Sequence, residues 1–244
     1  MNFEEGYIYH IYNQGNNRRQ IFFSRDNYLF FLEKMKAHIV PYADILAWCL
    51  MPNHFHLMVY LNRLSQNFNQ DFTSRDIQSG RDLESHPDLK SQAGDPSSIK
   101  EGTYSQGATQ SRTLTFNNSI GIMLASYTRA INKQQGWSGS LFRKETKSEC
   151  INCPSGITPS FIMQDGITKV TNDIPEKQYP TVCFNYIHQN PVNAKLVSQV
   201  TDWEFSSALD YTGLRKGKLV NKKRAEEYIS LSTSWGATQS RTPT

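Results

Sequence analysis

Two histidines lie one residue apart in the stretch CLMPNHFHLMVYL, which runs from Cys49 to Leu61 and is otherwise typical of a buried strand. Successive side chains of a strand point to opposite faces, so His54 and His56 are expected on the same face. Neutral imidazole is the commonest metal ligand, and the pair therefore favours a shared cation or phosphate. The alternative is a pair of partly exposed histidines with polar partners. The opposite face of the strand would enter a core through Phe55, Leu57 and Val59.

A second pair of polar residues lies far downstream, in FNYIHQNP. Tyr186 and Asn190 are four residues apart, so they project from one side of a short predicted helix over Thr181–Gln189. That helix should end before Pro191, because a residue that precedes proline is pushed out of the α region. The alternatives are a core role for Tyr186 in the apolar stripe of the helix and a capping role for Asn190.

The elements that must hold the histidine pair are predicted from apolar spacing in residues 1–61. The pattern predicts a strand, a polar turn that ends in two arginines, an amphipathic helix and a hairpin. In order, these are the strand Tyr7–Tyr12, the turn NQGNNRRQ, the helix from its N-cap Ser24 to Pro41, and the hairpin strands Asp44–Met51 and His54–Leu61.

The rest of the chain alternates between polar insertions and ordered segments. Residues 62–117 are rich in Ser, Gln, Asp and Gly, and they are predicted to be a mobile insertion because they have too little apolar surface to order. Residues 118–211 are expected to complete the domain, with a loop insertion near 150–180, and residues 212–244 to form a loose tail. The ordered elements of the second part are a helix from Asn118, a basic strand over Leu141–Ser148 and the Tyr186 helix. The heptapeptide GATQSRT occurs twice, at Gly107–Thr113 and Gly236–Thr242, and we have no physical account of it.

Without the insertions, the order of elements is strand, helix, strand, strand, helix, strand, helix. This order is typical of an α+β, ferredoxin-like (split βαβ) fold, in which an antiparallel sheet carries helices on one face. The other face is expected to stay free for a ligand, with the tyrosine-bearing helix added at the C-terminal end.

Composition is that of a globular protein with a polar excess. The chain has 244 residues, of which 38% are hydrophobic and 20% charged, and its net charge of +4 permits an anionic partner. There is no run of 18 apolar residues and no signal-like N-terminus, so no membrane is expected and a cytoplasmic location is the default. Cys150 and Cys153 have the spacing of half a zinc site, but no second pair follows, and a structural role is favoured unless Cys183 or His188 joins them.

Taken together, these segments resemble a known family. Five segments resemble the REP-associated tyrosine transposases, in chain order YHIYNQGNNRRQIFF, MPNHFHLMV, SYTRAINKQQGWSGSLFR, YIHQNPVNAKLV and DWEFSSALDY. These are related to the single-tyrosine insertion-sequence transposases of the HUH nuclease superfamily, named for His, a bulky hydrophobic residue and His. The resemblance covers most of the ordered chain, and residues 62–117 and the tail lie outside it.

The resemblance implies a metal-dependent enzyme that cleaves and transfers single-stranded DNA beside palindromic hairpins. It implies His54, His56 and Asn190 as metal ligands, Tyr186 as the nucleophile and a covalent 5′-phosphotyrosine intermediate. The implied cation is Mg²⁺ or Mn²⁺, and imidazole ligands suit Mn²⁺ better. Tyr127 is a rival tyrosine, but it lies in the apolar stripe of its helix and has no amide four residues later, so it is assigned to the core.

Several roles stay open on the sequence. Candidate phosphate contacts are Arg18, Arg19, Arg129, Lys133, Arg143 and Lys144, each of which is alternatively an ordinary surface charge. Tyr186 could serve the histidines of its own chain or those of a partner in a homodimer. The alternative functions are a domesticated protein that binds DNA hairpins without cleavage, and a phosphodiesterase that uses activated water.

Overall fold

The computed structural model describes residues 1–68, 112–153, 160–164, 167–171 and 179–231. Most of the predicted 62–117 insertion, at 69–111, and the last part of the tail therefore lie outside the described residues. The ends of that insertion are strands β4 (Ser65–Phe68) and β5 (Arg112–Thr115), which pair with each other. Strands β7 (Ser160–Gln164) and β8 (Ile167–Thr171) form a second two-stranded unit.

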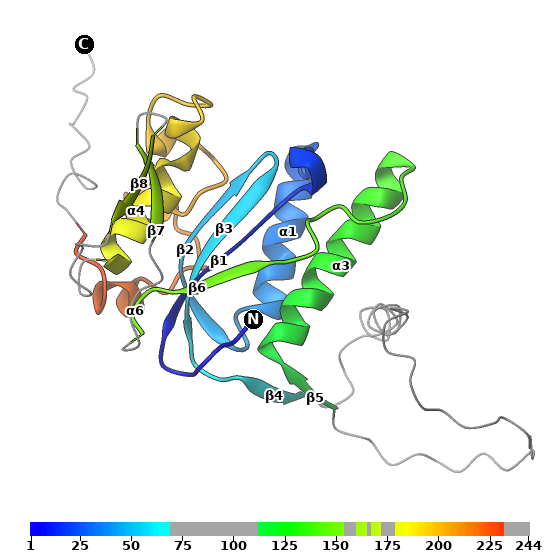
Figure 1. The fold of residues 1–244 in the computed structure, drawn as a ribbon, viewed down its shortest axis with the longest axis horizontal. Coiled ribbons are helices and arrows are strands. Elements are labelled where there is room, and N and C mark those ends of the chain that lie inside the picture. Colours follow the sequence, from blue (N-terminus) through cyan, green and yellow to red (C-terminus); the bar gives the residue numbers. More distant parts are fainter. Residues whose placement is uncertain (69–111, 154–159, 165–166, 172–178, 232–244) are drawn as a thin grey trace, which may run out of the picture.

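The centre of the molecule is a four-stranded antiparallel sheet (Figure 1). Its order is β2-β3-β1-β6, formed by β1 (Ile8–Gln14), β2 (Ala43–Met51), β3 (His54–Leu61) and β6 (Lys147–Cys150). Helix α1 (Arg25–His38) connects β1 to β2, and β3 lies between these two strands in the sheet. Helix α3 (Phe116–Gln135) lies in the connection from β3 to β6, and β1 lies between those two strands. The architecture is α+β, as the sequence predicts.

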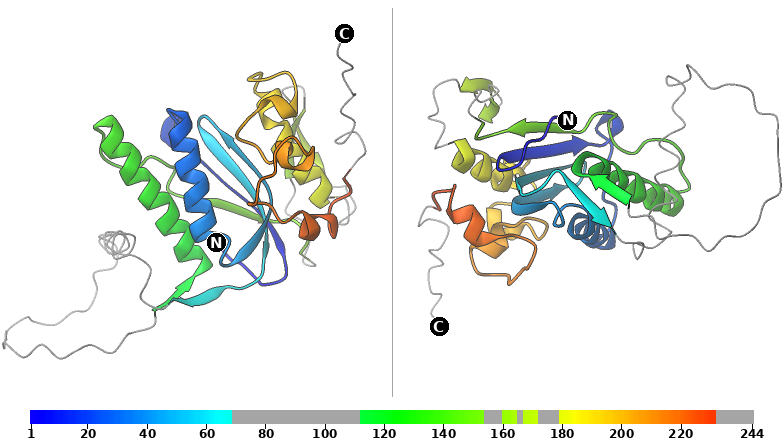
Figure 2. Two further views of the ribbon diagram at one scale, coloured as in Figure 1. Left: turned by 180° about the vertical axis from the view of Figure 1, so that it is seen from behind. Right: turned by 90° about the horizontal axis from the view of Figure 1, so that it is seen from below.

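Helices α1 and α3 pack side by side on one face of the sheet (Figures 1 and 2). Each begins at a side-chain cap: Asn27 Oδ1 accepts from the backbone of Ser24 before α1, and Thr115 Oγ1 accepts from Asn118 N in α3. The core between these helices and the sheet contains Phe31, Phe55, Leu57, Val59 and Tyr127. Tyr127 is fully buried and donates its hydroxyl to the Ile21 carbonyl, which confirms its assignment to the core.

The other face of the sheet is not free, which corrects the expectation from sequence. Helix α4 (Tyr179–Asn193) packs across β2 and β3 on this face. A second hydrophobic core lies there, formed by residues such as Cys49, Met58, Phe184 and Ile187. These residues are spread over separate elements, so local periodicity gave no sign that they meet.

Two predicted boundaries are wrong. The fourth strand is Lys147–Cys150 and not Leu141–Ser148, because Leu141 and Phe142 are buried in the first core at the end of β1. Helix α4 continues through Pro191 to Asn193, and the Asn190 carbonyl accepts from Ala194 N. A proline close to the helix end removes one donor only, and its ring is buried here, so packing outweighs the local preference.

Residues 212–231, predicted as part of a loose tail, are folded against β2. Val220 forms a parallel bridge to Ile45, and the Ile45 carbonyl accepts from Asn221 N. Helix α6 (Lys222–Glu226) follows, and Arg224 forms an ion pair with Asp44 of β2 at 3.3 Å. This segment covers a sheet edge that would otherwise be exposed. In the described part of the chain, no helix is long and apolar enough to cross a membrane.

Candidate metal and nucleophile site

Strand β3 places His54 and His56 on one face, because successive side chains of a strand point to opposite faces. The ring centres of His54 and His56 are 5.0 Å apart and their planes cross at 88°. His56 is buried, with 5% of its surface exposed, and His54 is partly exposed. On the other face of the strand, Phe55 lies fully buried in the first core.

Helix α4 brings the second predicted pair to the histidines of the same chain. The Tyr186 ring packs edge-on against His56, with centres 5.4 Å apart and planes at 80°. One turn later, Asn190 Nδ2 donates to the Tyr186 carbonyl at 2.9 Å, and the Asn190 side chain lies close enough to His54 to affect the pKa of that imidazole. Two imidazoles, an amide and a phenol thus converge from elements more than a hundred residues apart in sequence.

The ring orientation of His54 is set by its neighbour in the hairpin turn. His54 Nδ1 lies 2.6 Å from Asn53 Oδ1, while Asn53 Nδ2 donates to the Arg18 carbonyl at 3.3 Å. The second contact fixes the amide so that its oxygen faces the imidazole, and an amide oxygen only accepts. His54 therefore carries its proton on Nδ1, and its Nε2 lone pair is available to a ligand.

Burial shifts the pKa of each titratable group in the site. Desolvation lowers the pKa of His54, opposed by the neighbouring Asn190 side chain, and lowers the pKa of His56 well below its ordinary value, helped by nearby His10 and His54. Both imidazoles are therefore neutral at neutral pH, which is the form that binds metals. Desolvation also raises the pKa of Tyr186, although a hydrogen bond from Asn190 offsets part of this rise. The phenol is thus protonated when nothing else is bound.

These residues fit a divalent cation of the kind implied by the sequence resemblance. Each donor side chain has one atom tied to the protein: His54 Nδ1 to Asn53, His56 Nδ1 to His10, and Asn190 Nδ2 to the Tyr186 carbonyl. That arrangement leaves two imidazole nitrogens and one amide oxygen, a mixed set that suits Mn²⁺ better than Mg²⁺. Within the described ranges, no group of three or more His, Cys, Asp and Glu residues is placed to hold a metal.

Three residues of the site, His10, Tyr12 and Glu149, are not predicted from the sequence. His10 and Tyr12 lie on the same face of β1, and the register of β1 with β3 places Tyr12 directly opposite His56. His10 Nε2 lies 2.9 Å from His56 Nδ1, and Tyr12 donates its hydroxyl to Glu149 of β6 at 2.7 Å. Desolvation lowers the pKa of His10 to about 4, so this ring is also neutral. The alternation in YIYHIY shows that His10 and Tyr12 share a face, but not which strand lies beside them.

The predicted basic residues fall into two groups. Arg18 and Arg19 lie in the turn after β1, which packs on the hairpin turn: Gly15 N donates to the Asn53 carbonyl at 2.9 Å. Arg19 stacks over Trp137 at 4.2 Å. Arg143 is exposed and its backbone donates to the Gln14 carbonyl, so it is close to the same end of β1, and exposed Lys144 follows it.

The other two basic residues lie elsewhere. Arg129 and Lys133 are exposed on α3, which packs on the sheet face opposite the histidines. The structure therefore does not bring this pair to the site.

The cysteines and the DWEFSSALDY segment have structural roles. Cys150 and Cys153 are joined by a disulfide, so their sulfurs are not zinc ligands here, and Cys183 is a free buried thiol. His188 of α4 contacts Ser207 Oγ at 2.7 Å, and Ser207 in turn bonds the backbone of Trp48.

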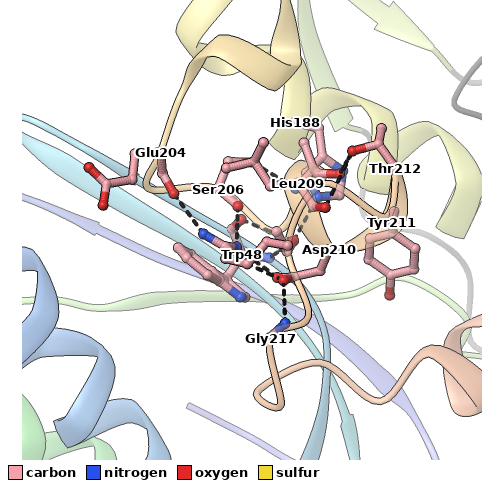
Figure 3. A network of polar contacts seen from close by, with 12 residues as sticks. Trp48, His188, Glu204, Ser206, Leu209, Asp210, Tyr211, Thr212 and Gly217 are labelled. Atoms are coloured by element: carbon pink, nitrogen blue, oxygen red, sulfur yellow. Dashed lines mark hydrogen bonds and ion pairs between the residues drawn. The ribbon is translucent and has the colours of Figure 1, made fainter. Parts of the chain in front are cut away.

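A buried carboxylate of the same segment forms an ion pair with a partly exposed arginine just after it. The Asp210 carboxylate pairs with the Arg215 guanidinium at 2.7 Å, and Arg215 also donates to the carbonyls of Glu204 and Ser206 (Figure 3). These contacts brace the segment after α4, and the Ser207 bonds to Trp48 and His188 tie it to β2 and to the helix that carries Tyr186 and Asn190.

Comparison with known proteins gives one similarity. No family model and no curated protein matches the sequence. Among solved structures, the chain is similar to that of a REP-associated tyrosine transposase bound to a REP hairpin, with 16% identity and a TM-score of 0.43. The similarity covers 95% of this chain and 93% of that one. At this identity and TM-score it carries no weight for function, which is argued below from the site.

Proposed function

We propose that the protein is a metal-dependent enzyme that cleaves and transfers single-stranded DNA at hairpin-associated sites, with Tyr186 as the nucleophile. The observation that carries the proposal is the convergence at α4: Tyr186 packs against His56, and Asn190 of the same helical face lies beside His54. The strand order β2-β3-β1-β6 supports a ferredoxin-like framework. A phenol beside two neutral imidazoles and an amide is the chemistry expected from the sequence resemblance.

The ligands of the cation would be His54, His56 and Asn190. A cation bound there would neutralise charge on the scissile phosphate and orient it, leaving coordination positions open for phosphate oxygens. Asn190 is well suited to this role because its amide nitrogen is held by the Tyr186 carbonyl, which leaves its oxygen as the atom that can bind a cation. One helical turn then fixes the distance between a ligand and the nucleophile.

The covalent step would proceed by in-line displacement at phosphorus. The Tyr186 oxygen forms a bond to phosphorus as the bond to the 3′-oxygen breaks, and the proton lost by the phenol balances the one gained by the 3′-hydroxyl. The product is a 5′-phosphotyrosine, from which a free 3′-hydroxyl can later displace the tyrosine without ATP. Because burial raises the pKa of Tyr186, the phenol needs assistance in losing its proton.

The DNA path is proposed over the turn that contains Arg18 and Arg19. This turn packs on the hairpin that carries His54, and Arg143 is close to the same strand end. Arginines there would contact the phosphates on either side of the cleaved bond. Arg129 and Lys133 are left out of this path, because α3 lies across the sheet from the histidines.

The test is covalent capture of DNA. The full-length protein is incubated with Mn²⁺ and labelled hairpin oligonucleotides that have single-stranded flanks, and adducts are separated under denaturing conditions. Wild type is expected to form an adduct that Tyr186→Phe does not form, because phenylalanine keeps the ring but lacks the attacking oxygen. Tyr12→Phe is the matched control, since Tyr12 lies in the same site with its hydroxyl held by Glu149. An adduct that survives Tyr186→Phe but not Tyr12→Phe would overturn the assignment.

A second candidate function is binding of DNA hairpins without cleavage. The observation that favours it is the raised pKa of Tyr186, which makes the phenol a weak nucleophile at neutral pH. This candidate predicts salt-dependent DNA binding by wild type with no adduct under Mn²⁺ or Mg²⁺. DNA cleavage that persists in Tyr186→Phe without an adduct would instead indicate attack by water.

A further inference from the structure

The contact between His10 and His56 joins two buried imidazoles on neighbouring strands. His10 Nε2 and His56 Nδ1 are 2.9 Å apart, and the two side chains are 6% and 5% exposed. The ring planes differ by 21° and the ring centres are 5.1 Å apart. The two nitrogens lie much closer together than the ring centres do, so the rings meet edge to edge in a nearly common plane. This is a hydrogen bond between ring nitrogens and not a face-to-face stack.

A hydrogen bond between two neutral imidazoles has two possible directions. If His10 Nε2 carries the proton, His56 accepts at Nδ1, and its own proton then lies on Nε2. If instead His56 Nδ1 carries the proton, His10 accepts and the His56 Nε2 lone pair is available. Only the second direction leaves His56 with a nitrogen that can bind a cation. At His54 the same choice is already made by Asn53, whose amide oxygen can only accept.

We propose that His10 is a positioning residue that accepts the Nδ1–H of His56 and so holds the His56 Nε2 lone pair toward the metal site. This inference rests on the proposed metal centre and adds the residue that prepares one of its ligands. Partners that bond the second nitrogen of a metal-bound histidine fix its tautomer and ring direction, and they raise its basicity. His10 would do for His56 what Asn53 does for His54.

The Tyr186 ring supports this geometry from a third side. It lies edge-on to both imidazoles, with its centre 6.0 Å from His10 and 5.4 Å from His56. The hydrogen-bonded pair therefore forms the surface on which the proposed nucleophile packs. A rotation of the His56 ring would therefore break the hydrogen bond to His10 and also disturb the packing of the Tyr186 ring against His56.

The first test reads the tautomer directly. Two-bond ¹H–¹⁵N spectra of metal-free protein labelled at histidine distinguish a ring protonated at Nδ1 from one protonated at Nε2. The expected result for His56 is the Nδ1–H form in wild type and in His10→Gln, whose side-chain oxygen can accept in place of Nε2. In wild-type protein, a His56 ring protonated at Nε2 would overturn the inference.

The second test measures Mn²⁺ binding by calorimetry. His10→Leu should lower the affinity about 10- to 100-fold, as loss of such a partner does at other metal sites, and His10→Gln should recover most of it. His38→Gln is the matched control, because His38 is also buried but lies on α1, across the sheet. Equal affinity for His10→Leu and wild type would overturn the inference and leave the metal centre intact. If wild type binds no Mn²⁺, the proposed metal centre fails, and the spectra still decide the direction of the His10 bond.

Discussion

At the scale of single residues, the site is organised by hydrogen bonds to the side-chain nitrogen of each proposed ligand that would not bind the cation. Asn53 holds one nitrogen of His54, His10 holds one nitrogen of His56, and the Tyr186 carbonyl holds the amide nitrogen of Asn190. Each proposed ligand therefore has its remaining donor atom directed before a cation arrives. Such preorganisation lowers the cost of ordering side chains on binding.

Asn190 gives the most direct test of this organisation. Asn190→Ala removes the proposed amide oxygen and the bond to the Tyr186 carbonyl, so Mn²⁺ affinity should fall by at least about tenfold, the lower end of the effect of losing a supporting group. Calorimetric titration with Mn²⁺ measures the loss. Gln189→Ala is the control, because Gln189 is an exposed residue next to Asn190 on the same helix. Unchanged affinity in Asn190→Ala would remove Asn190 from the ligand set.

At the scale of elements, the sequence predicts local pairings well and tertiary ones poorly. The spacing of His54 and His56 and that of Tyr186 and Asn190 each specify a shared face within one element. The register that sets Tyr12 opposite His56 joins two strands more than forty residues apart, and no local pattern encodes it. Helix α4 ends later than the sequence predicts, because burial of Pro191 outweighs the local backbone preference before a proline.

The turn after β1 depends on a close approach at Gly15. A Cβ added to Gly15 would collide with the carbonyl of Arg19 and with the Ile21 side chain. Gly15→Ala is therefore expected to destabilise the protein by about 1–3 kcal/mol, the usual cost of overpacking. It should also weaken DNA binding, because Arg18 and Arg19 are displaced with the turn. Urea unfolding measures the first effect, and fluorescence anisotropy with a labelled hairpin measures the second.

Gly121 provides the matched control for Gly15. It lies in α3, where an added Cβ would meet nothing within 4 Å. Gly121→Ala should raise stability by up to about 1 kcal/mol, because alanine favours the helix, and should leave DNA binding unchanged. Equal DNA binding by Gly15→Ala and wild type would argue against a role of this turn in the DNA path.

At the scale of the whole molecule, one hydrophobic core stabilises the framework and a second one positions the site. The first core, between the sheet and helices α1 and α3, is the one that apolar periodicity predicts. The second core seats α4 on the histidine-bearing face, and its members Cys49, Met58 and Phe184 come from separate elements. Residues 212–231, expected to be loose, pack on the outer edge of β2. The helix that carries the proposed nucleophile, Tyr186, is thus held by the part of the fold that sequence patterns predict least well.

The placement of α4 also decides how the site is shared between copies of the chain. Tyr186 packs against His56 of its own chain, so one chain contains the proposed nucleophile and all three proposed ligands. A mixture of Tyr186→Phe with a His54→Ala/His56→Ala variant should therefore form no covalent DNA adduct. If the tyrosine served a partner's histidines, mixed dimers would pair an intact tyrosine with intact histidines and recover activity. Each variant is also mixed with wild type, which should keep forming adduct and so exclude interference by the variant. Adduct in the mixture of the two variants would show that α4 leaves its own sheet in the working enzyme.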